Sequence, residues 1–464
     1  FTGSGATAAT NKLAGLLGLR VSEPLEREYG FSKAIPADRR PAVLIGPYEH
    51  HSNVLPWLES VADVIEVGLD PSGHVDLGDL AAKLERVRER PLRIGAFSAA
   101  SNVTGVITDV RGVARALHRG GAAACFDYAA SGPYVPIDMH PAGDAEARMD
   151  AIFVSTHKFA GGPSGSGILV AHRDLFRTRT PERPGGGTVD YVGGLDPEHV
   201  DYTHRLDERE EGGTPAILAD LRAGGAFLVK EMLGPERIVA HEIALGKRAL
   251  DRLSRHPRLD LYGPRGVDRL AILPFNVKGL HHDFVSTLLD HLFGIQNRSG
   301  CSCAGPYGHR LLGIDAARSQ AYRKQIAAGW LGLKPGWVRV SLPYYAAEEE
   351  IDFILEAIEF VADHGEAFLP LYRISWRSGA WRHVEHPALE AGPVEFTPAA
   401  LREAAPPGPT WSDGELSGER TRYLREAREL AAALEARAPV PLGGPARPDH
   451  APLLWFRFVH ADEA

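Results

Sequence analysis

The sequence predicts an α/β fold with a mostly parallel β-sheet, followed by a smaller α+β domain. Between residue 1 and about residue 180, short apolar runs alternate with longer amphipathic segments. Strands and helices in alternation are typical of parallel strands joined by crossover helices. The 464 residues are 44% hydrophobic and 24% charged, so the chain can bury a large core without disulfides or structural metal.

The first predicted domain covers residues 1–255. Five apolar runs are predicted to be buried strands: 42–45, 64–67, 94–98, 122–126 and 151–154. A spacing of 3.6 residues predicts helices over 77–90 and 109–120. Residues 185–215 are rich in glycine and charge without a clear period, which predicts a long functional loop. Residues 216–253 are predicted to be helical, with a break at Gly234-Pro235.

A second, smaller domain is predicted over residues 256–370. It contains expected strands at 270–277 and 337–341 and expected helices at 283–292 and 348–364. The remaining residues, 371–464, are rich in proline and hold four of the seven tryptophans. We expect an extension that covers the main body, with one helix near 419–437.

Charge and composition exclude several classes of protein. With 51 Lys plus Arg against 60 Asp plus Glu, the net charge of −9 predicts no general attraction to nucleic acid or anionic membranes. No apolar run approaches 18 residues, so no membrane span is expected. Three cysteines exclude a disulfide framework and a four-cysteine zinc site, so we expect no metal and a reducing, cytoplasmic location. The start at Phe1 shows no signal peptide, and we expect that an N-terminal segment is missing.

The segment 150–170, DAIFVSTHKFAGGPSGSGILV, is the most informative part of the chain. An apolar strand leads into Ser155-Thr156-His157-Lys158, and a glycine-rich turn and a second strand follow. A lysine at a strand end, among small residues that let other groups approach the backbone, suits a lysine that forms a Schiff base. Ser155 and His157 are placed to bind a phosphate. The alternative is a surface hairpin with an incidental lysine.

A single acid, Asp127, ends the apolar strand in the stretch AAACFDYAA. A carboxylate buried at a strand end needs a cationic partner. The protonated pyridine nitrogen of pyridoxal 5′-phosphate (PLP) is one such partner. The alternative is an aspartate that caps a turn.

Together these segments resemble the class V aminotransferase family of fold-type I PLP-dependent enzymes, and most of all its cysteine desulfurases and selenocysteine lyases. Further motifs follow in the family's order: GAT at 5–7, EHHSNVLPW at 49–57, SNVTG at 101–105, GGGT at 185–188, GTP at 213–215, RSGCSC at 298–303 and RVS at 339–341. The resemblance covers about residues 1–365. It implies a large domain with a mixed, mostly parallel seven-stranded sheet and a smaller C-terminal domain.

The resemblance implies roles for five residues around the cofactor ring and the substrate. Lys158 would form the Schiff base and later transfer protons. Asp127 would keep the pyridine nitrogen protonated, and His50 would stack on the ring and assist proton transfer. Asn102 would lie beside the ring and the substrate. Arg339 would bind the substrate carboxylate, for which a guanidinium fork is suited; the alternative is a structural ion pair.

The phosphate of PLP would be bound mainly at the start of the first helix. Ala6 and Thr7 stand where the glycine turn enters that helix, and free backbone N–H groups at such a point bind anions. Ser155 and His157 would add side-chain donors. In the family a GGG-[ST] loop reaches the phosphate of the other subunit, so Thr188 would serve a partner's site in a homodimer. From composition alone this loop is a flexible linker.

Cys303 stands at the position of the desulfurase nucleophile. There a thiolate would attack the sulfur of cysteine, become a persulfide and leave alanine; Cys301 is either a resolving thiol or a passive neighbour. Where many relatives have a glutamine that donates to the cofactor, this chain has Ala130.

The function expected first is therefore cysteine desulfuration, with a sulfur-acceptor protein as a possible partner. The alternatives are a C–S lyase, an epimerase or an aminotransferase of a biosynthetic pathway, and a non-catalytic scaffold on the same fold. The presence of both Lys158 and Asp127 argues against the scaffold.

Overall fold

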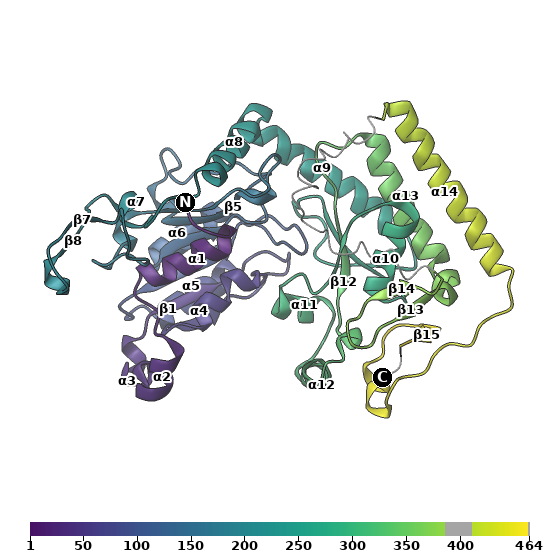
Figure 1. Ribbon diagram of the computed structural model, residues 1–464, viewed down its shortest axis with the longest axis horizontal. Coiled ribbons are helices and arrows are strands. Elements are labelled where there is room, and N and C mark those ends of the chain that lie inside the picture. The colour runs from purple at the N-terminus through teal and green to yellow at the C-terminus, as the bar shows by residue number, and fades with distance from the viewer. Residues whose placement is uncertain (386–410, 463–464) are drawn as a thin grey trace. The chain divides into compact units, whose positions relative to one another are not determined.

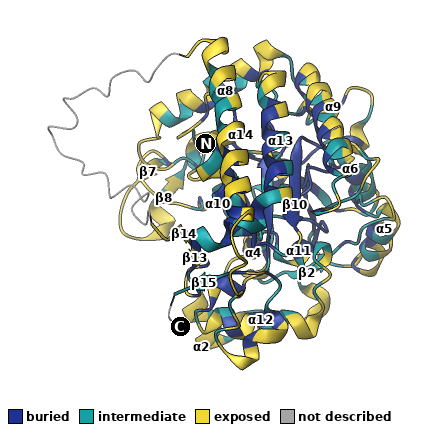
Figure 2. Ribbon diagram, turned by 90° about the vertical axis from the view of Figure 1, so that its right-hand side faces the viewer, coloured by how far each residue is buried: buried dark blue, intermediate teal, exposed yellow. Residues whose placement is uncertain are grey.

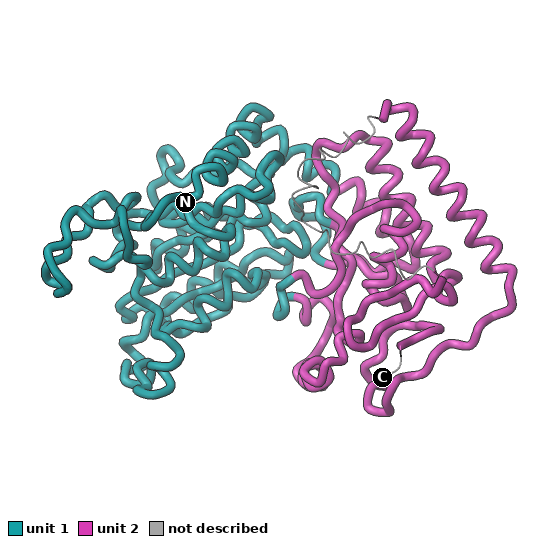
Figure 3. Tube along the Cα trace, viewed as in Figure 1, with its two compact units in different colours: residues 1–246, 263–272, 303–307 teal, residues 247–262, 273–302, 308–464 magenta. Residues whose placement is uncertain are grey.

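The computed structural model describes residues 1–385 and 411–462, which form two compact units (Figure 3). The first unit comprises residues 1–246, 263–272 and 303–307. The second comprises 247–262, 273–302 and the described residues from 308 onward. Helix α9 (Pro235–Leu253) continues from the first unit into the second.

A six-stranded sheet in the order β2-β1-β3-β4-β5-β6 forms the centre of the first unit (Figure 1). Its strands are β1 (Ala42–Ile45), β2 (Asp63–Glu66), β3 (Arg93–Ser98), β4 (Ala123–Asp127), β5 (Ala151–Ser155) and β6 (Gly167–Ala171). All neighbours are parallel except β5 and β6, which are antiparallel. The predicted fold class is confirmed. The sheet has six strands rather than seven, because the chain after β6 forms the separate hairpin β7 (Val189–Val192) and β8 (Val200–Tyr202).

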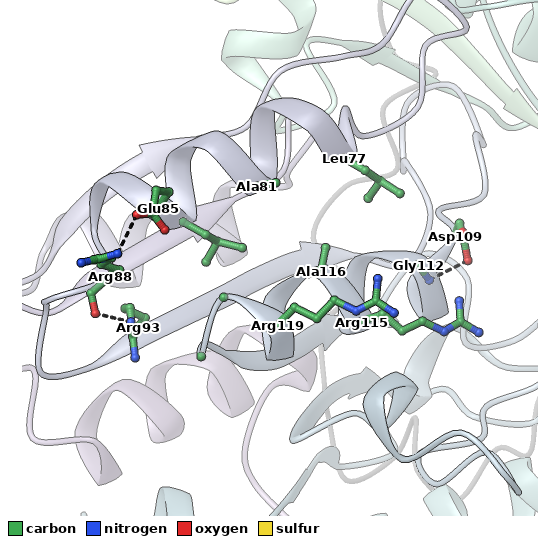
Figure 4. Close-up of a pocket in the computed structure, with 13 residues that line it drawn as sticks. Leu77, Ala81, Glu85, Arg88, Arg93, Asp109, Gly112, Arg115, Ala116 and Arg119 are labelled. Atoms are coloured by element: carbon green, nitrogen blue, oxygen red, sulfur yellow. Dashed lines mark hydrogen bonds and ion pairs between the residues drawn. The ribbon is translucent and has the colours of Figure 1, made fainter.

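Several helices of this unit bury an apolar face, and two of them begin at an aspartate cap. The longer helices are α1 (Gly5–Leu16), α5 (Leu77–Arg86), α6 (Val110–Arg119) and α8 (Ile217–Leu233); the shorter are α2 (Glu23–Tyr29), α3 (Phe31–Ala34), α4 (Leu55–Leu58) and α7 (Leu206–Arg209). Asp76 caps α5 by accepting the N–H groups of Gly78 and Asp79, and Asp109 caps α6 through Gly112. A groove of about 860 Å³ lies between α5 and α6 (Figure 4), and none of the predicted site residues lines it.

The core of the first unit joins α1 to the sheet. Buried side chains of α1, among them Ala9 and Leu13, pack with Val43, Trp57 and Phe153. The chain before α1 is held against β6, since Thr2 N–H donates to Gly167 O (2.9 Å) and Gly167 N–H donates to Gly3 O (3.0 Å). This contact fixes the glycine turn from which α1 starts.

The second unit contains a four-stranded sheet in the order β11-β12-β10-β9. Its strands are β9 (Leu259–Leu261), β10 (Ile272–Val277), β11 (Arg298–Gly300) and β12 (Trp337–Ser341), and its helices are α10 (His282–Phe293), α11 (Gly305–Leu311), α12 (Ala316–Ala327) and α13 (Glu348–His364). Figure 2 shows that α13 and β10 are largely buried, whereas α14 is exposed on its outer face.

The C-terminal extension belongs to the second unit. It supplies the three-stranded sheet β14-β13-β15 (Trp381–His383, Tyr372–Ile374 and His460–Ala461) and helix α14 (Asp413–Glu435). A capping box between Ser412 and Glu415 starts α14. Residues 386–410 and 463–464 of the predicted extension lie outside the described residues. Within the described part of the chain, no helix combines the length and the apolar character needed to cross a membrane.

Replacing Phe153 by alanine tests the packing of the first unit. Its side chain is fully buried on β5, so Phe153→Ala is expected to cost about 3–5 kcal/mol of unfolding free energy. Urea unfolding followed by circular dichroism measures this change. The control Val170→Ala, at a position on β6 that is 44% exposed, should change it by less than about 1 kcal/mol. Equal effects of the two substitutions would contradict the assigned core.

Candidate active site

Four of the predicted site residues lie at the carboxyl ends of four adjacent strands. His50 follows β1, Asn102 follows β3, Asp127 ends β4 and Lys158 follows β5. These strands are neighbours in the order β1-β3-β4-β5, and all are parallel. Crevices at this edge of a parallel sheet are where α/β proteins bind their ligands.

Lys158 ends the short 3₁₀ turn Thr156–Lys158 directly after β5. Thr156 is buried and its hydroxyl donates to Ser166 O (2.5 Å), while the side chains of His157 and Lys158 are exposed. A Cβ on Gly162 would stand 1.9 Å from Thr156 O, so the turn requires glycine there. Partial burial and the charge of Lys158 lower the pKa of His157. A neutral imidazole therefore stands beside an accessible amine.

Asp127 is 3% exposed, and its Oδ1 accepts the N–H of Ala129 (2.7 Å). Burial raises the pKa of its carboxyl, and the Ala129 N–H and the charge of Lys158 only partly offset this effect. A nearby cation stabilises the ionised form of a buried carboxyl group such as this one. The protonated pyridine nitrogen of PLP would supply that cation, so the site fits the cofactor at this end.

The start of α1 forms a cradle beside β5. Gly5 has φ +63°, and a Cβ on it would lie 2.6 Å from Ser155 Oγ and 2.7 Å from His157 Cε1. The N–H of Ala6 donates to Ser155 Oγ (2.9 Å), and the hydroxyls of Thr7 and Ser52 are 2.6 Å apart. The four predicted phosphate-binding residues are therefore neighbours. A helix start with hydroxyl and imidazole groups around a glycine turn fits a phosphate.

Glu49 belongs to this site, although we assigned it no role from the sequence. Its carboxyl is buried and accepts three hydrogen bonds, from Ser98 N (2.7 Å), Ser98 Oγ (2.6 Å) and Asn53 Nδ2 (2.7 Å). A Cβ on Gly46 would lie 2.4 Å from Glu49 Oε1, so glycine makes room for the carboxyl. Burial raises the pKa of Glu49 to about 7, and the nearby charge of Asp127 adds to this rise. The only sequence signal was an acid directly before His50.

Residues 301–305, which carry Cys301 and Cys303 and are called the cysteine loop here, contact the segment that carries His50. His51 N–H donates to Cys303 O (2.8 Å), and His51 Nε2 accepts the N–H of Gly305 (3.1 Å). Cys303 belongs to the first unit and Cys301 to the second, and both are half-buried and form no disulfide. Cys125 is buried in β4, where burial raises the pKa of its thiol far above the ordinary range. It is therefore unsuited to act as a nucleophile.

Two further predicted site residues, Thr188 and Arg339, belong to other elements of the chain. Thr188 is buried, and its hydroxyl donates to Gly185 O (2.7 Å), which closes the glycine loop on itself. Its predicted contact with a partner subunit stays a prediction. Arg339 lies on β12 in the second unit, directly opposite Arg298 on the antiparallel strand β11.

Comparison with known proteins identifies the family. The Aminotransferase class-V family matches residues 31–354, so the chain belongs to this family and the resemblance seen in the sequence is confirmed. A probable cysteine desulfurase of Halalkalibacterium halodurans is 33% identical over 60% of this chain and 66% of its own length. A cysteine desulfurase of Dickeya dadantii is 30% identical over 71% of both chains.

Solved structures support the same relationship. The cysteine desulfurase of Thermococcus onnurineus NA1 superposes with a TM-score of 0.60 at 26% identity, over 78% of each chain. A cysteine desulfurase of Escherichia coli, at 21% identity and a TM-score of 0.59, shows the same fold.

The raised pKa of Glu49 predicts a pH-dependent stability. The pKa of Glu49 is 4.5 in the unfolded chain and about 7 in the folded chain. Between these two pH values, the folded protein keeps a proton on Glu49 that the unfolded protein releases. The contribution of Glu49 to stability is therefore full below about pH 4.5 and is lost as the pH rises through about 7, a change of about 3 kcal/mol. Glu49→Gln should remove this part of the pH dependence.

Urea unfolding of the cofactor-free protein at about pH 5 and about pH 8 measures the effect. The free-energy difference between wild type and Glu49→Gln should be larger at the lower pH. Glu85→Gln, at a side chain that is 70% exposed, is the control and should leave the pH dependence as in the wild type. A difference that is equal at both pH values would disprove the protonation of Glu49.

Proposed function

We propose that this protein is a PLP-dependent cysteine desulfurase, with Lys158, Asp127 and Cys303 as its principal residues. The observation that carries the proposal is the meeting of two groups of residues. The edge of the sheet that bears Asp127 and Lys158 also bears the His50-His51 segment, which follows β1, and this segment is hydrogen-bonded to the cysteine loop. The family and the names of the relatives support the same activity.

When bound, PLP serves as an electron sink that stabilises negative charge on the substrate Cα. Lys158 Nζ would hold the cofactor covalently and, once released, take the proton from Cα. Asp127 would keep a proton on the ring nitrogen, which its burial favours because a buried anion gains most from a cationic partner. Ala6, Thr7 and the side chains beside Gly5 would bind the phosphate.

Arg339 and Arg298 support an amino-acid substrate. They are directly opposite on an antiparallel pair, so their side chains lie on one face of that sheet. A guanidinium fork binds a carboxylate through two parallel hydrogen bonds. We propose that Arg339 binds the carboxylate of cysteine.

The sulfur transfer would be carried out by the Cys303 thiolate. A bond forms between Cys303 Sγ and the substrate sulfur, and the C–S bond breaks with its electron pair left on the substrate carbon. That carbon, Cβ, takes up a proton, Cα regains the proton that it gave to Lys158, and the product leaves as alanine. A thiol of a sulfur-acceptor protein would then remove the terminal sulfur from Cys303. We propose a reducing, cytoplasmic location, which suits a chain whose three cysteines form no disulfide.

Two observations favour a second candidate, another PLP reaction such as C–S lysis, epimerisation or transamination. Ala130 stands where a donor to the cofactor would be expected. Helix α11 begins only two residues after Cys303, which leaves little chain for a long delivery arm.

Three variants separate these activities. The purified protein with PLP should show a visible absorbance band that Lys158→Ala lacks, because Lys158 is the proposed covalent partner of the cofactor. Alanine and sulfide should form from cysteine and a thiol reductant at a rate that Cys303→Ser lowers at least about 100-fold. Cys301→Ser is the matched control and should retain most of the activity. Full activity of Cys303→Ser, or pyruvate as the product, would reject desulfuration.

We also propose that the protein is a homodimer that uses α8. Leu218, Leu221, Leu228 and Met232 are between 67% and 84% exposed, and their spacing places them along one side of this helix. Gly224 and Gly225 lie between them with open space at their Cβ positions, which permits close approach of another chain. An apolar face of this size on a helix is typical of an interface.

Substitutions on α8 test the dimer. Leu221→Glu with Leu228→Glu places two carboxylates on the apolar face, and it should shift the protein to a monomer at micromolar concentration. Light scattering after size-exclusion chromatography measures the mass. Leu442→Glu, at an exposed leucine of the C-terminal extension, is the control and should leave the dimer intact. A wild-type protein that is monomeric would disprove the proposal.

A further inference from the structure

His51, which lies outside the cysteine loop, forms two hydrogen bonds with it. The backbone N–H of His51 donates to Cys303 O (2.8 Å), and the Nε2 of its imidazole accepts the N–H of Gly305 (3.1 Å). Gly305 is the first residue of α11. Its N–H has no acceptor within that helix, so His51 caps α11 from a distance of 254 residues in the chain.

The loop needs such support because its backbone is strained. Ser302 and Cys303 have φ values of 50° and 55°, a region that residues other than glycine rarely occupy. A conformation of this kind persists only where the surroundings hold it. The two hydrogen bonds of His51 act on either side of Ala304, whose side chain is fully buried.

From these contacts we propose that His51 is a positioning residue for Cys303: by capping α11 and binding the Cys303 carbonyl, it holds the thiol in one place for attack on the substrate sulfur. This inference rests on the proposed function of Cys303. It differs from the role expected for His50, because two hydrogen bonds join His51 to the loop that carries the proposed nucleophile.

His51 is itself fixed to the sheet through its neighbours. Asn53 donates to Glu49 Oε2 (2.7 Å) and accepts the indole N–H of Trp57 (3.2 Å), and Glu49 is bonded to Ser98 at the end of β3. Ser98 is paired in register with Asp127 on β4. The same strand edge that carries the carboxylate for the cofactor therefore also determines, through Glu49 and His51, where Cys303 lies.

The chemistry of the cap suggests matched variants. Since Nε2 accepts a hydrogen bond, the ring proton of a neutral His51 is on Nδ1. His51→Ala removes the acceptor. His51→Gln retains one, because the amide oxygen of glutamine reaches about as far from Cα as Nε2 does. His172 serves as a control, since its Nδ1 similarly accepts the N–H of Asp174 at another 3₁₀ turn of the first unit.

Hydrogen exchange of the cofactor-free protein tests the cap without any catalysis. His51→Ala should speed the exchange of the amides of residues 303–307 by about three- to tenfold, the effect of losing one hydrogen bond. His51→Gln and His172→Gln should exchange these amides at nearly the wild-type rate. Unchanged exchange in a folded His51→Ala protein would disprove the cap.

Steady-state kinetics with cysteine test the positioning. His51→Ala should lower kcat by about tenfold or more and change KM less than about twofold, because the thiol is misplaced while substrate binding is not affected. His51→Gln should restore most of kcat. Faster exchange with an unchanged kcat would reject the positioning role. Full activity of Cys303→Ser would instead reject the proposed function. The hydrogen-exchange measurement does not depend on that outcome, so the two failures can be told apart.

Discussion

The buried carboxyl group of Glu49 connects the parts of the candidate site, because it satisfies the backbone and the hydroxyl of Ser98 at the end of β3 while it fixes Asn53. Three donors meet one carboxyl in a space that only glycine at position 46 leaves open. Burial makes the loss of any of these bonds costly, since a buried polar group left without a partner costs more than an ordinary hydrogen bond contributes. The residues on either side of Glu49 and Asn53 are thereby held in a fixed geometry.

Electrostatics at this edge follow from the same burial. Asp127 and Glu49 are both buried acids, and the charge of Asp127 makes ionisation of Glu49 less favourable. The charge of Lys158 partly offsets the effect of burial on Asp127. A cation bound beside Asp127 would be stabilised further, so the arrangement suits a ligand with a protonated ring nitrogen. The proposed phosphate site depends instead on the close approach of Gly5 to Ser155 and His157.

Cys303, which we propose as the nucleophile, is connected to the same framework. His51 continues the turn that begins with Glu49 and reaches the loop of Cys303 through two hydrogen bonds. A strained loop could adopt several conformations if it were unsupported. The contacts made by His51 select one of these conformations and relate it to the strand ends, where the lysine and the aspartate lie.

The sequence by itself determined the α/β class, the strand ends and the family, because alternating strand and helix patterns and motifs such as STHK at 155–158 are local in the chain. It also indicated Lys158, Asp127 and Cys303 by their place in those motifs. Only the tertiary structure decided the parts played by Glu49 and His51, and the six strands of the sheet. Glu49 and His51 are hydrogen-bonded to residues that lie 49 and 254 positions away in the chain. A local sequence pattern cannot predict a hydrogen bond across such a separation. Burial, which raises the pKa of Glu49, is likewise a property of the packed chain.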